Sequence, residues 1–92
     1  YLLDEPEAAL SPVRQLAFLR IIHQLVSSGN AQFIIATHSP ILLGYPKARI
    51  WSFDCVPIAS VSYEDTEHYQ ITKAFLNRTD KFLEDLFRDD EK

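Results

Sequence analysis

Two short apolar runs, each followed at once by polar residues and a proline, constrain the fold of this chain more than any other feature. The first run reads YLLDEP from Tyr1, and the second reads FIIATHSP from Phe33. Runs of large apolar residues are typical of parallel strands that are buried on both faces. A helical pattern lies between them, so the sequence predicts a strand–helix–strand unit with two fully buried, parallel strands.

The segment between the two runs carries the signals of an amphipathic helix. Ser11 is a favourable N-cap, and Pro12 suits the first helical position. Large apolar residues then recur at intervals of three and four, at Phe18, Ile21, Ile22 and Leu25. Gly29 and Asn30 are typical of a helix end, so we expect one helix between the two strands.

The sequence after the second run predicts a short helix and a hairpin. Ser39 and Pro40 repeat the cap-plus-proline signal for a short helix. Residues 49–54 and 58–63 are typical of strands. The short connection between these two segments favours an antiparallel hairpin, which we expect at the edge of the sheet.

From Asp65 onward the pattern is helical. Apolar residues are spaced for helix faces on both sides of a break that we expect at residues 77–80. The acidic residues 89–91 oppose the negative end of a helix dipole, so a frayed end is expected there. The sequence as a whole predicts an α/β fold, with helices flanking a sheet and a helical C-terminal tail.

The chain is expected to be one part of a larger domain. It has 92 residues, begins at Tyr1 and contains no Met, which predicts a piece of a longer protein. The three apolar residues before Asp4 are also too few for a complete central strand. We assign residues 1–54 to the core of this partial domain, and residues 55–92 to an edge strand and C-terminal helices.

The composition is that of an ordinary globular protein, with 47% hydrophobic and 24% charged residues. A formal net charge of -4 argues against broad attraction to nucleic acid or to an anionic membrane surface. No apolar run approaches the roughly 20 residues that span a bilayer. Cys55 is the only cysteine, which excludes an internal disulfide. These features favour a cytoplasmic protein without a membrane segment, in which Cys55 is a buried thiol.

Asp4 and Glu5 are adjacent carboxylates at the end of the first predicted strand. In phosphate-transfer sites, an aspartate in this position holds Mg²⁺, and a neighbouring carboxylate orients or deprotonates the attacking water. Side chains alternate along an extended segment, so we expect the two acids to point in different directions. The alternative is a polar strand end that begins a turn at Pro6, and residue types alone favour neither interpretation.

His38 follows the second predicted strand. If the strands are parallel neighbours, His38 lies at the same carboxyl edge as Asp4 and Glu5, where open α/β sheets bind ligands. A neutral imidazole there hydrogen-bonds a γ-phosphate or the attacking water. A lone histidine is more often an ordinary loop residue, but the shared edge favours the functional interpretation. His23 and His68 have no metal-ligand spacing, and we interpret both as solvated side chains.

These motifs resemble those of the ABC-type ATPases and, within them, the AAA-like ATPases related to the RecF and SMC proteins. YLLDEPEAALSP is similar to their Walker B segment and the D-loop that follows it. FIIATHSP is similar to the strand and H-loop that carry their switch histidine. The resemblance covers residues 1 to about 54, and it implies the C-terminal part of an ABC ATPase-like, P-loop NTPase sheet.

The resemblance implies a role for each matching residue. Asp4 is implied as the Walker B aspartate that acts on Mg²⁺, Glu5 as the catalytic base, and His38 as the switch residue that senses the γ-phosphate of ATP. The D-loop, which meets the partner subunit in a nucleotide-sandwich homodimer, corresponds to Ala8, Ala9, Leu10 and Ser11. Transporter-type D-loops end in Asp, whereas this chain has Ser11.

The chain has no phosphate-binding loop. Such a loop needs the pattern G-x-x-x-x-G-K-[ST], but the two glycines, Gly29 and Gly44, are far apart and neither precedes a lysine. We therefore expect ATP and Mg²⁺ to be bound by the intact protein, with the P-loop on an upstream segment. This chain alone is expected to be inactive.

Two other functions stay open on the sequence. One is a non-catalytic remnant, an interaction module that folds only against a partner. The other is a metal-dependent nuclease or phosphatase built on Asp4 and Glu5, for which Asp54 and Asp65 are the only plausible additional acids. The sequence does not indicate whether ATP hydrolysis drives DNA maintenance, defence or transport, so a DNA or other effector partner is also open.

Overall fold

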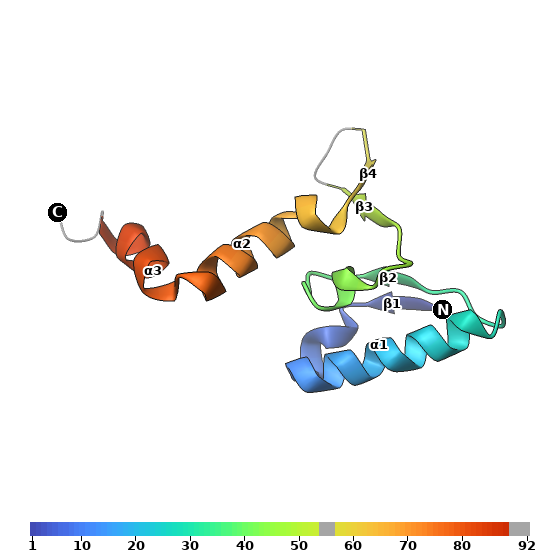
Figure 1. Ribbon diagram of the computed structural model, residues 1–92. Helices are drawn as coiled ribbons and strands as arrows, with labels where there is room; N and C mark the ends of the chain where they lie inside the picture. The colour runs from blue at the N-terminus through green and yellow to red at the C-terminus, as the bar shows by residue number, and fades with distance from the viewer. Residues whose placement is uncertain (54–56, 89–92) are drawn as a thin grey trace.

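The computed structural model describes residues 1–53 and 57–88 (Figure 1). The strands are β1 (Leu2–Asp4), β2 (Ile34–Ala36), β3 (Ile50–Ser52) and β4 (Ala59–Val61). The α-helices are α1 (Pro12–Ser27), α2 (Glu67–Asn77) and α3 (Thr79–Phe87). Three short 3-10 turns complete the order, namely η1 (Pro6–Ala9), η2 (Leu42–Gly44) and η3 (Tyr63–Asp65).

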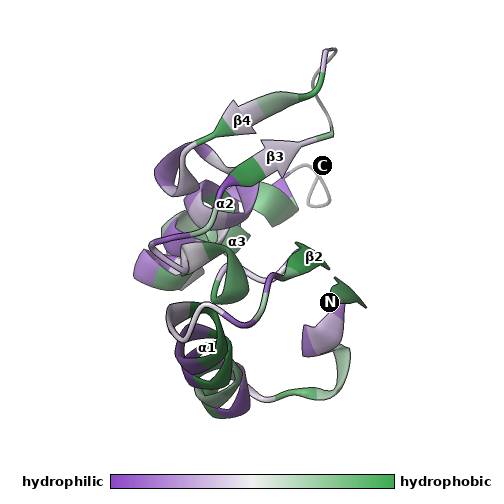
Figure 2. Cartoon of the chain, turned by 90° about the vertical axis from the view of Figure 1, so that its right-hand side faces the viewer, coloured by the Kyte–Doolittle hydropathy of each residue, from purple (hydrophilic) through white to green (hydrophobic). Residues whose placement is uncertain are grey.

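β1 and β2 form a parallel pair that is connected through α1. Leu3 lies opposite Ile35, and Asp4 lies opposite Ala36. Figure 2 shows β2 in the apolar colour, as expected from its sequence. The predicted strand–helix–strand unit is confirmed, and the carboxyl ends of its two strands lie at one edge of the sheet.

Only one face of this strand pair is covered. Leu3 and Ile35 are half-buried, whereas Leu2 is 79% exposed and Ile34 is 62% exposed. The prediction of strands buried on both faces is therefore wrong for this structure. Alternate side chains of a strand point to opposite faces, and the described residues supply a covering layer for one face alone.

α1 begins and ends where the sequence predicts. The Ser11 hydroxyl accepts a hydrogen bond from the Arg14 N–H at 3.3 Å, and Pro12 is the first helical residue. The helix ends at Ser27, and Gly29 follows with a φ of 79°. Glycine adopts this left-handed conformation without strain, because it has no Cβ. The local signals thus define this helix.

β3 and β4 pair antiparallel, with Trp51 opposite Ser60. The predicted hairpin is confirmed, but its expected place at the edge of the first sheet is wrong. Among the described residues it forms a separate two-stranded sheet, because the chain after η2 runs away from β2 before β3 begins (Figure 1). Asp54 and Cys55 lie outside the described residues, so the buried thiol stays a prediction.

α2 and α3 form an arm that leads away from the unit of β1, α1 and β2 (Figure 1). The break predicted at residues 77–80 is confirmed at Arg78, whose φ of -145° and ψ of 58° interrupt the helix. Phe75 and Phe82 pack edge to face across this break, with ring centroids 5.5 Å apart. The frayed end expected at residues 89–91 lies outside the described part of the chain.

The buried core is small. Its apolar members in the described chain are Ile22 of α1 and Leu42 of η2. The radius of gyration is 16.1 Å, whereas a compact chain of this length has about 12 Å. Within the described ranges, no helix combines the length and the apolar character that crossing a membrane requires.

Candidate functional site

Glu5 lies at the carboxyl end of β1, where the chain leaves the sheet. Its N–H donates to the Ala36 carbonyl at 2.7 Å. Its φ of 47° and ψ of 54° are left-handed, and no other non-glycine residue in the described ranges has a positive φ. This conformation costs about 1–2 kcal/mol, and such strain is concentrated at functional sites. A left-handed turn, rather than the alternation of an extended strand, therefore sets the direction of the Glu5 side chain.

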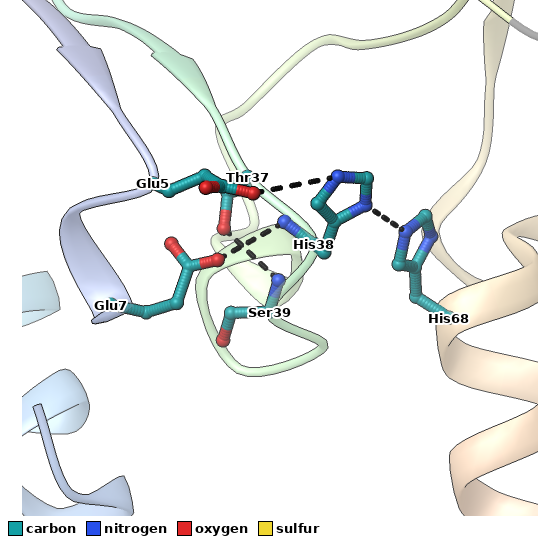
Figure 3. Close-up of polar contacts among 6 residues, drawn as sticks. All are labelled: Glu5, Glu7, Thr37, His38, Ser39 and His68. Carbon is teal, nitrogen blue, oxygen red and sulfur yellow. Dashed lines mark hydrogen bonds and ion pairs between the residues drawn. The ribbon is translucent and has the colours of Figure 1, made fainter. Parts of the chain in front are cut away.

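His38 follows β2 at the same edge, and its ring points toward Glu5 (Figure 3). The distance from His38 Nε2 to Glu5 Oε1 is 3.6 Å. The two side chains are 77% and 55% exposed, so both are accessible to a ligand from solvent. The structure thus brings together two of the residues that the sequence singled out.

Asp4 is the last residue of β1, and it is exposed. A single exposed carboxylate fits Mg²⁺ that arrives with a nucleotide, because such an ion is held by one or two carboxylates together with phosphate oxygens. The described residues contain no cluster of three or more His, Cys, Asp or Glu side chains suited to a metal. Asp65 therefore adds no ligand to Asp4 and Glu5, and Asp54 lies outside those residues.

Glu7 is a site residue that the sequence reasoning missed. Its Oε2 accepts a hydrogen bond from the His38 N–H at 3.2 Å (Figure 3). Its Oε1 is buried and has no hydrogen-bond partner among the described residues. Burial alone would raise the pKa of Glu7, but the nearby Thr37 hydroxyl, the backbone N–H groups of Glu7 and His38 and the His38 ring when it is protonated outweigh burial. The pKa of Glu7 is therefore lowered from its ordinary value.

The Glu7 carboxylate therefore connects η1 to the loop after β2. A signal for it was present in the order DEPE, where an acid follows Glu5 after a single proline. Its partner was not predictable, because the hydrogen bond to His38 spans 31 residues.

Gln15 and Ser39 form a second connection between these segments. The Ser39 hydroxyl donates to Gln15 Oε1, and Gln15 Nε2 donates to the Leu10 carbonyl at 3.1 Å. Ser39 Oγ also accepts from the N–H groups of Ile41 and Leu42, both at 3.2 Å. It thus holds the turn before η2, whereas the N-cap of η2 itself is Ile41 and not Ser39 as the sequence predicts. Because Ser39 is buried, these bonds are shielded from water. α1 thus joins the segment after η1 to the loop after β2.

The four residues predicted as a D-loop run from the second half of η1 to the N-cap of α1. Ala8 and Ala9 belong to η1 and are exposed. Leu10 is extended, with a φ of -115°, and Ser11 is the exposed N-cap of α1. Ser11 therefore caps α1 in this chain. Ala8 and Ala9 are accessible to a partner molecule.

His68 is the second residue that the sequence reasoning missed. It lies in the first turn of α2, and its Nε2 is 3.1 Å from His38 Nδ1 (Figure 3). The interpretation of His68 as a solvated side chain is wrong, because the fold places the start of α2 beside the loop after β2. His23 is exposed, as expected, although its Nδ1 is 2.9 Å from the Tyr45 hydroxyl oxygen.

Residues 1–44 match the protein family described as "AAA domain, putative AbiEii toxin, Type IV TA system". The matched part contains Asp4, Glu5 and His38. The match supports an AAA-type, nucleotide-binding ATPase domain of the P-loop NTPase class in this part of the chain. The helices and small sheets of this structure are compatible with the α/β fold class of such domains.

Protein ea59 of Escherichia phage lambda is 47% identical to this chain over 51 residues. The matched segment covers 54% of this chain and 10% of that protein, so the chain corresponds to a small part of its relative. No solved structure matches the chain.

Proposed function

We propose that this chain is the C-terminal half of an ABC-type domain that hydrolyses ATP to ADP and phosphate with Mg²⁺. The observation that carries the proposal is the 3.6 Å approach of Glu5 Oε1 and His38 Nε2 at the carboxyl ends of two parallel strands. Open α/β sheets bind their ligands at such an edge. The family match of residues 1–44 supports the same class of site. A P-loop from outside these residues completes the nucleotide site.

Each side chain at this edge has one task in the proposed reaction. Asp4 holds Mg²⁺, which when bound neutralises charge on the phosphate oxygens. Glu5 takes the proton of the attacking water onto a carboxylate oxygen. His38 donates a hydrogen bond from Nε2 to an oxygen of the terminal phosphate. Glu7 holds the His38 backbone during these events through its hydrogen bond to the His38 N–H.

The segment from Ala8 to Ser11, in which Ala8, Ala9 and Ser11 are exposed, supports a homodimer as the working state. Its position beside Glu5 lets a second copy approach the nucleotide from across the interface. Closing two copies around ATP excludes bulk water from the site but retains the attacking water beside Glu5, which strengthens the hydrogen bond from His38 to the phosphate. Hydrolysis then opens the dimer.

The substitution Glu5→Gln in the complete protein tests the proposal. Glutamine has nearly the same shape but cannot take the proton of water, so we expect kcat to fall at least about 100-fold. ATP binding is expected to remain, and the ATP-bound dimer is expected to accumulate. Phosphate release measures kcat, equilibrium binding of labelled ATP measures affinity, and light scattering measures the dimer.

Glu84→Gln is the matched control, because Glu84 is an exposed carboxylate on α3 and carries the same substitution away from the edge. Its kcat is expected to equal that of the unmodified protein. Continued multiple turnover by the Glu5→Gln protein would remove Glu5 from the role of base.

A further inference from the structure

His38 lies between two side chains that face the two nitrogens of its ring. Nε2 faces Glu5 Oε1 at 3.6 Å, and Nδ1 faces His68 Nε2 at 3.1 Å (Figure 3). A neutral imidazole carries a single proton on one of its two nitrogens. The two neighbours therefore decide which nitrogen of His38 carries it.

Glu5 favours a proton on His38 Nε2. An ionised carboxylate is only an acceptor, so a proton on Nδ1 would leave the Nε2 lone pair facing a carboxylate oxygen. Two acceptors would then oppose each other. With the proton on Nε2, that contact is attractive, and Nδ1 becomes an acceptor that needs a donor. His68 Nε2–H, 3.1 Å away, is such a donor.

His68 is held in place by contacts that do not involve the two rings. Thr66, two residues before it, is buried, and its hydroxyl accepts from the Tyr69 N–H and donates to the Tyr63 carbonyl. The Tyr63 hydroxyl donates to the Pro40 carbonyl in the loop after β2. The start of α2 is thereby attached to the loop that carries the other ring, and the imidazole of His68 stays within reach.

We propose that His68 is a positioning residue for His38. Its Nε2–H donates to His38 Nδ1 and keeps His38 in the tautomer whose proton is on Nε2, toward Glu5. This inference rests on the proposed function, in which the same Nε2–H donates to the terminal phosphate. The hydrogen bond at one ring nitrogen sets the proton on the other, and loss of such an orienting partner costs about 10–100-fold in activity.

The hydrogen bond itself is tested by nuclear magnetic resonance, without nucleotide, in the complete protein with nitrogen-15-labelled histidine. At a pH of about 8, above the ordinary histidine pKa of about 6.5, a free imidazole is neutral. We expect a scalar coupling between His68 Nε2 and His38 Nδ1, with the proton bonded to His68 Nε2. The absence of this coupling, or a proton bonded to His38 Nδ1, would overturn the proposal. His23→Gln is the control and should leave the coupling unchanged.

The functional consequence is tested with two substitutions of His68. His68→Leu has no donor, so kcat for ATP hydrolysis is expected to fall about 10-fold, with KM unchanged. His68→Gln retains an N–H donor and should recover most of kcat. An unchanged kcat in the leucine variant, or an equal loss in both variants, contradicts the positioning role. If the leucine variant does not fold, the coupling in the unmodified protein decides the matter.

Failure of the two proposals is distinguishable. A protein that shows the coupling but does not hydrolyse ATP refutes the proposed function, while the hydrogen bond from His68 to His38 is established. A protein that hydrolyses ATP but shows no coupling refutes the positioning role alone.

Discussion

Residues 1–44 contain the edge that we propose as catalytic and are called the catalytic edge below. Within this region and within the helical arm (residues 63–88), the hydrogen bonds differ in range. In the catalytic edge, the bond from His38 to Glu7 spans 31 residues, and the bond from Ser39 to Gln15 spans 24. In the helical arm, the bond from Thr79 to the Phe75 carbonyl spans four residues. Long-range bonds hold side chains of separate elements at fixed distances, which a site requires. Local bonds mainly support the helices themselves.

Burial follows the same contrast. The catalytic edge contains the buried residues Ile22, Ser39 and Leu42, whereas Thr66, at the start of α2, is the buried residue of the described arm. Further along the arm, several large apolar side chains are half or more exposed, among them Leu76 and Leu86. The part of the arm that contributes to the site is therefore its beginning, where it carries His68.

Tyr63, at the start of the helical arm, contacts residues of the catalytic edge. A Cβ on Gly44 would lie 3.1 Å from the Tyr63 ring, so the ring packs where η2 has no side chain. Burial raises the pKa of Tyr63, with smaller contributions from Tyr69 and Glu64. The hydroxyl thus stays protonated and donates to the Pro40 carbonyl.

The largest effect on stability is expected from Ser39→Ala in the catalytic edge. The substitution leaves Gln15 Oε1 and the N–H groups of Ile41 and Leu42 without their partner in a buried position. The free energy of unfolding should fall by about 1–3 kcal/mol, as measured by urea unfolding. Ser28→Ala removes an exposed hydroxyl and should change it by less than about 0.5 kcal/mol. Equal losses of unfolding free energy in the two variants would show that buried long-range bonds stabilise this protein no more than exposed local ones.

A smaller loss in the free energy of unfolding is expected from Glu7→Gln, and this loss depends on pH. At neutral pH we expect a loss of about 1 kcal/mol, because the amide keeps an acceptor but not the charge. The pKa of Glu7 is lowered in the folded protein, so the unfolded chain takes up the proton first as the pH falls. The stabilisation is complete above a pH of about 4.5 and disappears as the pH falls through the lower folded pKa.

Urea unfolding at several pH values checks this prediction. The Glu7→Gln protein should lose less stability than the unmodified protein between neutral and acidic pH. Glu64→Gln, on an exposed residue of η3, is the control and should keep the original acid dependence. An acid dependence of Glu7→Gln identical to that of the unmodified protein would show that the carboxylate does not connect η1 to the loop after β2.

The smallest effect is expected from Leu76→Gln in the helical arm. Leu76 is 68% exposed on α2, and both residues are good helix formers. The free energy of unfolding should change by less than about 0.5 kcal/mol. A loss above about 1 kcal/mol would mean that this face of the arm is covered in solution, and the contrast with the catalytic edge would then not hold for it.

Local signals in the sequence determined the elements of this protein. Ser11 begins α1, Gly29 follows its end, and the break between α2 and α3 falls within the predicted residues. Each of these features depends on neighbours within one helical turn, or on the periodicity of side chains along one element. The meeting of Glu5 and His38 was also predictable, because parallel neighbouring strands place their carboxyl ends at one edge.

Tertiary structure alone decided the partners of these residues. The left-handed turn at Glu5, the bond from Glu7 to the His38 backbone and the approach of His68 to the His38 ring have no local signature strong enough to predict them. The two contacts to His38 join residues about 30 positions apart, and they form only when the elements pack. The amino-acid pattern therefore indicates where the chemistry lies, whereas packing sets which nitrogen of His38 faces Glu5.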